Sequence, residues 1–154
     1  MATKITVYKK AQLTAEQIKV LTYLYLPILG KKAYSLYLSF SQLVNFSVGK
    51  SLDFDHNFFI NLLNISPQKL IETRRRLEAI GLIDTFENQD NLVLILNNPL
   101  TANSFFGNPN LHVLLQKNIP STETYNSIKQ IFHTNSFISK NYTNITETNL
   151  VKTF

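Results

Sequence analysis

The chain has 154 residues, no cysteine and a net charge of +5. A chain of this length can form one domain with a buried core. The lack of cysteine excludes disulfides, thiolate metal sites and cysteine nucleophiles, and three widely spaced histidines give no metal-ligand pattern. No signal peptide opens the sequence, and no apolar run is long enough to span a membrane. We therefore expect a cytoplasmic protein without metal, cofactor or small-molecule substrate.

The positive charge is concentrated at the amino end. Residues 1–33 hold six lysines and one glutamate, whereas residues 34–154 hold nine basic and nine acidic side chains. A basic segment attracts acidic partners such as nucleic acid. Any such attraction is expected to come from the first 33 residues.

The first elements are a short strand and a helix. Residues 4–9, KITVYK, alternate as a strand does. Thr14 with Gln17 forms a capping box that opens a helix, and Pro27 and Gly30 are expected to end it.

The next helix, expected over residues 31–44, is apolar in too many directions for a one-sided surface helix. Two interpretations are open: the helix is central to the core, or its second face contacts a partner. Under the second, Tyr34, Tyr37 and Phe40 would lie near an interface.

The later segments give the order of a winged helix. Asp55 is expected to cap a short helix, and Ser66 caps a longer one that Gly81 ends. Two strand-like runs, 82–86 and 92–96, then form a hairpin. The predicted fold class is mainly α with a small β-hairpin: a winged helix with extra C-terminal helices, in which Gly107 and Pro109 separate two short helical pieces and Ser121 caps the last.

The end of the chain differs in composition. Residues 134–154 are rich in Asn, Thr and Ser, which is typical of a linker or a poorly ordered end. We expect one winged-helix oligomerisation and docking domain over residues 1–133 and a polar tail over 134–154.

The stretch VNFSVGKS, residues 44–51, ends like a nucleotide-binding P-loop. That motif needs a glycine six positions before its lysine, and Val44 stands there instead. A helical pattern precedes the stretch where a strand is required. We therefore expect a loop between helices that Gly49 closes, and no ATPase activity. Since no other catalytic constellation is present, the chain is not expected to be an enzyme.

Three arginines, Arg74, Arg75 and Arg76, stand in the helix expected over residues 66–80. In helix-turn-helix proteins such a helix reads the major groove. However, Glu78 lies four residues after Arg74 and Glu72 four before Arg76, so two of the three have intrahelical partners within reach. The favoured interpretation is a solvated helix face, and nucleic-acid contact is the alternative.

Three blocks resemble one known family, in the same order. They are LTYLYLPILGKKAYSLYLSF, LIETRRRLEAIGLIDTF and NPLTANSFFGNPNLHVLLQKNI, which together span roughly residues 13–119. In these blocks the chain is similar to the amino-terminal winged-helix domain of the Firmicute and Mollicute replication-initiation proteins of the DnaB/DnaD family, closest to its DnaB helicase loaders. It departs from the family at Phe40, where tryptophan is frequent, and at Gly107-Asn108, where an acidic residue is usual.

The resemblance implies a non-catalytic scaffold that self-associates and acts in the primosome, with other initiation proteins and the replicative helicase as partners. It also implies further helical domains associated with single-stranded DNA binding, so the chain is either a fragment or a shortened member. Peripheral membrane association through the full-length protein is a further implication.

Two functions from different classes remain open. The first is a helicase-loader docking domain, whose candidate oligomer interface comprises Ile5, Val7, Tyr8, Tyr34, Tyr37 and Phe40. The second is a winged-helix DNA-binding transcription regulator. A docking domain is expected to bind DNA only weakly and without sequence preference. Under either function, the candidates for nucleic-acid contact are Lys9, Lys10, Lys69, Arg74, Arg75 and Arg76.

Overall fold

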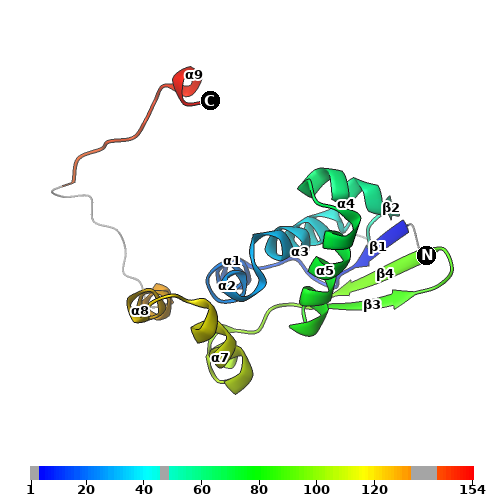
Figure 1. Cartoon of the computed structure of the whole chain (residues 1–154), viewed down its shortest axis with the longest axis horizontal. Helices are drawn as coiled ribbons and strands as arrows, with labels where there is room; N and C mark the ends of the chain where they lie inside the picture. Colours follow the sequence, from blue (N-terminus) through cyan, green and yellow to red (C-terminus); the bar gives the residue numbers. More distant parts are fainter. Residues whose placement is uncertain (1–3, 46–48, 133–141) are drawn as a thin grey trace.

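The computed structural model describes residues 4–45, 49–132 and 142–154. It confirms the predicted class, a mainly helical winged helix with extra helices at its C-terminal side (Figure 1). The β-structure is larger than predicted, because the hairpin is half of a four-stranded sheet.

The sheet has the order β2-β1-β4-β3. Its strands are β1 (Lys4–Tyr8), β2 (Phe54–Asp55), β3 (Ile83–Glu87) and β4 (Asn91–Leu96). β1 pairs in parallel with β4 and antiparallel with β2. Strand β1 is therefore an inner strand, since both of its edges carry strands.

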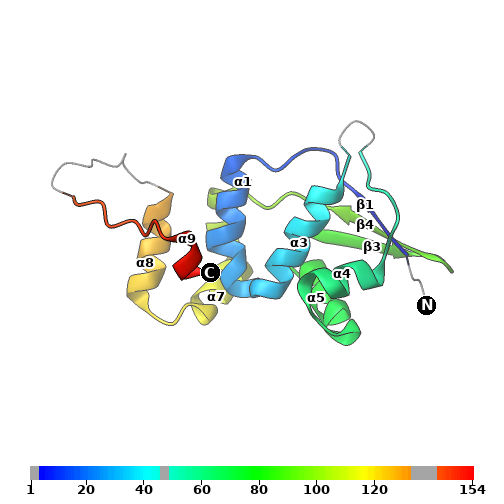
Figure 2. The same cartoon turned by 90° about the horizontal axis from the view of Figure 1, so that it is seen from above.

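Helices cover one face of this sheet. They are α3 (Lys31–Leu43), α4 (His56–Leu63) and α5 (Pro67–Ala79), and they lie beside the strands in both views (Figures 1 and 2). Alternate strand residues point into the core, as the burial of Ile5 and Val7 shows.

The first helical segment is continuous from residue 15 to residue 29. It consists of α1 (Ala15–Val20), a wide π turn η1 (Leu21–Tyr25) and α2 (Leu26–Leu29). The capping box is confirmed, because Thr14 and Gln17 bond reciprocally at 2.9 and 3.1 Å. Pro27 does not end the segment. It lies inside α2 directly after the wide turn, where the ladder of hydrogen bonds is already interrupted.

The other predicted helix ends are confirmed. Asp55 caps α4 by accepting from the backbone N–H of Asn57, and Ser66 caps α5 by accepting from that of Lys69. Gly81 follows α5 with φ of 85°, a conformation that strains residues with a side chain.

The C-terminal helices are α6 (Ala102–Phe106), α7 (Pro109–Asn118), α8 (Thr122–Ile131) and α9 (Leu150–Thr153). The first two are the predicted short pieces, and Ser121 caps α8 as expected. α7 and α8 lie beyond α1 and α2, on the side away from the sheet (Figures 1 and 2). Within the predicted tail, residues 142–149 have no helix or strand, α9 follows them, and part of the tail lies outside the described residues. The division at residue 133 stays a prediction.

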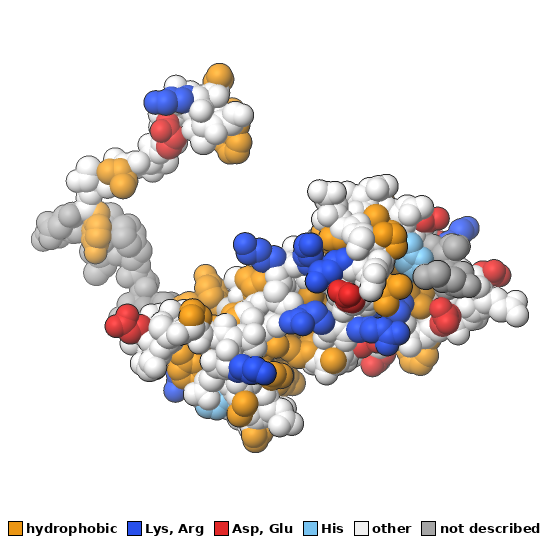
Figure 3. Space-filling model, viewed as in Figure 1, with side chains coloured by type: hydrophobic (Ala, Val, Ile, Leu, Met, Phe, Trp, Pro, Cys, Tyr) orange, Lys and Arg blue, Asp and Glu red, His pale blue; other side chains and the backbone are white. Residues whose placement is uncertain are grey.

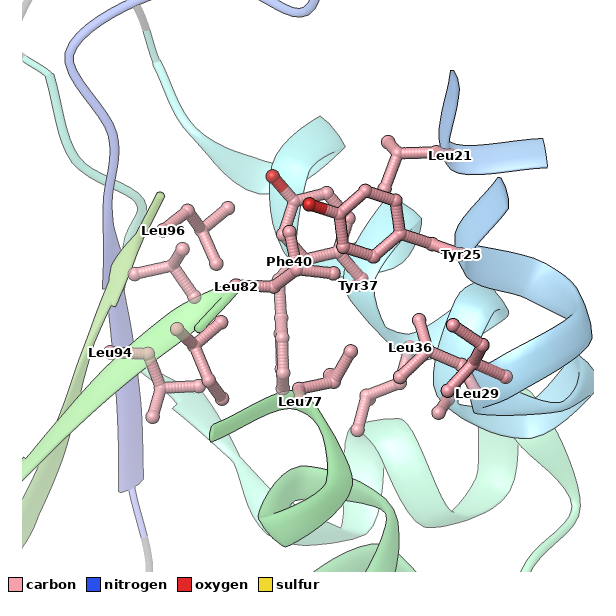
Figure 4. Close-up of a cluster of buried hydrophobic side chains, with 14 of the residues drawn as sticks. Leu21, Tyr25, Leu29, Leu36, Tyr37, Phe40, Leu77, Leu82, Leu94 and Leu96 are labelled. Atoms are coloured by element: carbon pink, nitrogen blue, oxygen red, sulfur yellow. The ribbon is translucent and has the colours of Figure 1, made fainter. Parts of the chain in front are cut away.

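The core is built around α3. Leu36, Tyr37 and Phe40 point from α3 between the first helical segment and the sheet (Figure 4). The ring of Phe40 packs edge-on against that of Phe59, with centroids 4.9 Å apart. The excess of apolar residues in this helix thus reflects its central place in the core, the first of the two interpretations.

Two buried tyrosines also bond to the segment that follows β4. The Tyr37 hydroxyl donates to the carbonyl of Asn97 at 2.6 Å. The backbone N–H of Leu100 donates to the Tyr25 hydroxyl at 3.1 Å. These bonds fix the path of the chain from the sheet to the C-terminal helices.

Phe40→Ala tests the central place of α3. Because the Phe40 ring is fully buried, we expect the free energy of unfolding to fall by about 3–5 kcal/mol, as measured by urea titration. Phe154→Ala is the matched control, since the Phe154 side chain is 97% exposed. Equal effects of the two substitutions would contradict the described core.

Candidate docking and nucleic-acid surfaces

The helix-turn-helix unit consists of α4, a short turn and α5. Asn64 ends α4 in the left-handed conformation, with φ of 52°, and Ser66 begins α5 two residues later. In DNA-binding proteins of this class the second helix enters the major groove. The outward side chains of α5 therefore decide whether it can do so here.

Arg74 is held within the protein. Its Nε lies 3.2 Å from Oε2 of Glu78, the predicted i,i+4 ion pair. Glu78 also accepts from the Thr85 hydroxyl at 2.7 Å, which ties α5 to strand β3. Burial, and then the charge of Arg74, lower the pKa of the nearby His56.

Arg76 does not pair with Glu72 as expected. Its Nε donates to the carbonyl of Leu29 at 3.0 Å, and its Nη2 donates to that of Ile28 at 2.6 Å. These carbonyls end α2, where helical partners are lacking, so the guanidinium completes their hydrogen bonding. Glu72 pairs instead with Lys69 at 3.7 Å.

Arg75 alone among the three arginines has neither an ion pair nor a carbonyl partner in the described part of the chain. It is exposed. The neighbouring wing carries the exposed acids Asp84, Glu87 and Asp90, which would repel a phosphate backbone. This arrangement favours the solvated-face interpretation of α5.

Lys9 is buried, which sequence reasoning did not predict. Its side chain is 2% exposed, and its ammonium lies 5.6 Å from the centre of the Tyr37 ring without a hydrogen-bond partner. Burial lowers the pKa of Lys9 from 10.5 to about 8. The proposed nucleic-acid role of Lys9 was therefore wrong in this fold, whereas Lys10 is exposed.

Four of the six candidate interface residues lie in the core. Ile5, Val7, Tyr37 and Phe40 are each 2% exposed or less, because strand β1 and helix α3 are central rather than peripheral. They were wrongly placed at a surface. Of the other two, Tyr34 is half-buried and its hydroxyl lies 2.7 Å from that of Thr22, while Tyr8 is 38% exposed.

Tyr8 belongs to an apolar patch on the outer face of the sheet. It pairs with Ile95 across β1 and β4, and Val93 pairs with Phe86 across β4 and β3. Ile95 is 37% exposed. We call these four residues the outer sheet patch. Their alternation with core residues was visible in the sequence, but the place of β1 between β2 and β4 was not.

The loop that ends in Gly49-Lys50-Ser51 has a structural role. Gly49 has φ of 75°, and its carbonyl accepts from the backbone N–H of Lys9. The buried Ser51 hydroxyl accepts from the Val7 N–H at 2.9 Å and donates to the Leu52 carbonyl. The serine of a P-loop would instead bind the metal of a bound nucleotide. Residues 46–48 of this motif lie outside the described residues.

A groove runs between α2, α5 and α7, and sequence reasoning missed it. Its larger hollow, about 540 Å³, is bounded mainly by Ile28, Leu29, Ile80, Leu100, Leu111 and Leu114. A second hollow of about 320 Å³ contains Lys31, Lys32 and Lys69. Leu29 and Arg76 line both, so we treat them as one feature, the α2–α5–α7 groove. In the view of Figure 3, Lys and Arg side chains gather over the middle of the molecule, beside apolar side chains.

Across residues 4–45, 49–132 and 142–154, no group of three or more His, Cys, Asp or Glu side chains could hold a metal ion. Over the same residues, no helix is both long and apolar enough to cross a membrane.

Comparison with known proteins decides the family. The model of the DnaB N-terminal winged helix domain matches residues 2–153. The chain belongs to this family. The DnaB match covers almost the whole length, including the C-terminal helices and most of the predicted tail.

Two relatives agree with this assignment. The replicative helicase loading and DNA remodelling protein DnaB of Staphylococcus aureus is 31% identical over 124 residues, which cover 78% of this chain and 26% of that protein. The chain thus spans about a quarter of its curated DnaB relative. The crystal structure of residues 1–300 of the primosome protein DnaB from Geobacillus stearothermophilus has a TM-score of 0.75 and 25% identity, and the match covers 96% of this chain and 57% of that one.

The substitution Lys9→Met tests the burial of the Lys9 amine in this DnaB domain, because its effect on the stability of the fold should depend on pH. The folded state binds the proton less tightly than the unfolded chain, so the charged amine destabilises the fold fully below about pH 8, and this cost disappears as pH rises to 10.5. We expect the variant to be more stable than the unmodified protein at pH 7, with the difference shrinking over that window.

Urea titrations of the variant and the unmodified protein between pH 7 and pH 10.5 check this prediction. Lys10→Met, at the exposed neighbouring lysine, serves as the control. A Lys9→Met difference that stays constant across the pH range would contradict a depressed pKa.

A second prediction concerns DNA. Because Arg74 and Arg76 have internal partners, we expect Arg75→Ala to change duplex affinity little. Replacing the exposed N-terminal lysines Lys4, Lys10, Lys31 and Lys32 by alanine should remove most of a weak, salt-dependent binding. Fluorescence anisotropy at two salt concentrations measures both. A loss of about 1–3 kcal/mol at Arg75, confined to one DNA sequence, would instead indicate direct reading of a base.

Proposed function

We propose that this domain is a non-catalytic docking module in the initiation of DNA replication, which self-associates and binds other replication proteins, the replicative helicase among them. The observation that carries the proposal is the family match across residues 2–153. The relative named as a helicase loader and the neighbour named as a primosome protein support the same role.

The surface of α5 supports docking over DNA reading. A transcription regulator would present the arginines of this helix to base edges. Here Arg74 pairs with Glu78 and Arg76 caps the carbonyl end of α2. DNA contact is therefore proposed to be weak and without sequence preference.

Self-association is proposed to use the outer sheet patch. Tyr8, Phe86 and Ile95 are 38%, 57% and 37% exposed, on a face of the sheet that none of the described helices covers (Figure 2). Exposed apolar clusters of this kind are typical of protein interfaces. Two copies can bury the same patch against each other around a two-fold axis, the commonest symmetry of homo-oligomers.

The domain is proposed to work in the cytoplasm. Across its described residues it has no membrane-spanning helix. Peripheral association with a membrane is proposed to act through the full-length protein.

Light scattering coupled to size exclusion tests self-association. We expect at least a dimer at tens of micromolar concentration, and a monomer for the double substitution Phe86→Lys/Ile95→Lys, because two charges on the patch are costly to bury.

The matched control is Leu62→Lys, on α4 and outside the outer sheet patch, whose side chain is 55% exposed. It should keep the mass of the unmodified protein. A monomer for the unmodified protein at high micromolar concentration would refute self-association, and an unchanged mass for the double variant would refute the patch as its site.

A further inference from the structure

The α2–α5–α7 groove has one apolar half and one basic half. In the apolar half, Leu100 and Leu114 are 38% and 39% exposed, although both side chains border a hollow. In the basic half, Lys31 and Lys32 stand at the start of α3 and are exposed. Arg76 lines both halves and joins them.

The charged side chains that line the groove are all basic. Among the described residues, neither hollow is lined by an aspartate or a glutamate, whereas Lys31, Lys32, Lys69 and Arg76 all line it. Lys69 shares an exposed ion pair with Glu72 at 3.7 Å, and such pairs are weak enough to exchange partners. An occupant with carboxylates therefore complements the basic half.

The guanidinium of Arg76 is already oriented to bind a carboxylate of such an occupant. Its bonds to the carbonyls of Ile28 and Leu29 use two of the five N–H donors of a guanidinium. The same bonds fix the orientation of the group, so little side-chain freedom is lost when a carboxylate binds to the remaining donors.

The apolar half favours protein over nucleic acid. Single-stranded nucleic acid binds by stacking its bases on exposed aromatic rings, and the only aromatic residue that lines the groove within the described chain is Tyr25, which is 2% exposed. The aliphatic side chains of Leu100, Leu111 and Leu114 instead suit the apolar anchors of a peptide or an amphipathic helix.

We propose that the α2–α5–α7 groove binds a segment of a partner protein in which apolar anchor residues stand next to carboxylates. The anchors would lie against α7 and the segment after β4, and the carboxylates would meet Arg76 and the lysines of α3. This proposal rests on the proposed docking function and names the chemistry of the partner that docks.

A peptide selection tests it. A displayed library of random peptides of about 16 residues is selected against the purified domain, and the strongest binder is synthesised and measured by fluorescence anisotropy. We expect selected sequences to combine Leu, Ile, Phe or Met with Asp or Glu, and a helix or strand pattern of anchors to recur. Selected peptides that lack either feature would overturn the proposal.

Variants of the groove then locate the binding. Leu114→Glu and the double substitution Lys31→Glu/Lys32→Glu should each weaken binding of that peptide by at least about tenfold, because each removes one half of the complementarity. The matched controls are Val113→Glu and Lys117→Glu, on α7 but outside the groove lining, and they should bind as the unmodified domain does. Thermal unfolding of every variant identifies any that fails to fold, and Leu114→Ala replaces Leu114→Glu in that case.

Three outcomes distinguish the groove as the binding site, the class of its occupant and the self-association of the domain. Equal binding by groove and control variants refutes the groove as the site. Binding of a labelled single-stranded oligonucleotide with the same dependence on Leu114 refutes a protein occupant. The groove lies apart from the outer sheet patch, so light scattering on the same variants should still show the oligomer. A monomeric mass with intact peptide binding would refute self-association and leave the groove assignment standing.

Discussion

Two hydroxyl groups in the core determine where the C-terminal helices lie. Tyr25 and Tyr37 belong to different helices, yet both bond to the backbone between residues 97 and 100, immediately after the sheet ends. Each bond gives a partner to a backbone group that is partly shielded from water, so together the two bonds stabilise this path of the chain out of the core. α7 consequently lies beside α2, and the groove exists because of that placement. The groove, for which we propose a binding role, thus depends on two tyrosine side chains that are themselves buried.

The local features of the fold were predictable from the sequence because their causes are local. Thr14 with Gln17, Asp55, Ser66 and Gly81 act within a few residues of their own positions, and each does what its residue type favours. Taken in chain order, these local signals predict the succession of helices and strands in a winged helix.

The errors concern contacts between distant residues. Arg76 has an acidic neighbour one turn away, but two bare carbonyls 47 and 48 positions away lie closer to its guanidinium. Likewise, the aromatic residues of α3 suggested an interface because the sequence does not show that β1 and the first helical segment enclose that helix. Lys9 illustrates the same limit, since nothing in its local sequence indicates burial. The outer sheet patch and the groove depend on tertiary structure in the same way.

The parallel pairing of β1 with β4 has a consequence for how the domain forms during synthesis. Lys4 pairs with Asn91, which stands 87 positions later in the chain. The ribosome therefore releases β1 long before its main partner exists, and closing so long a loop carries an entropic cost that slows folding. Until β4 emerges, the edge of β1 that faces β4 has no partner strand, a condition that favours aggregation. The pairing of β1 is therefore complete only after β4 has been made.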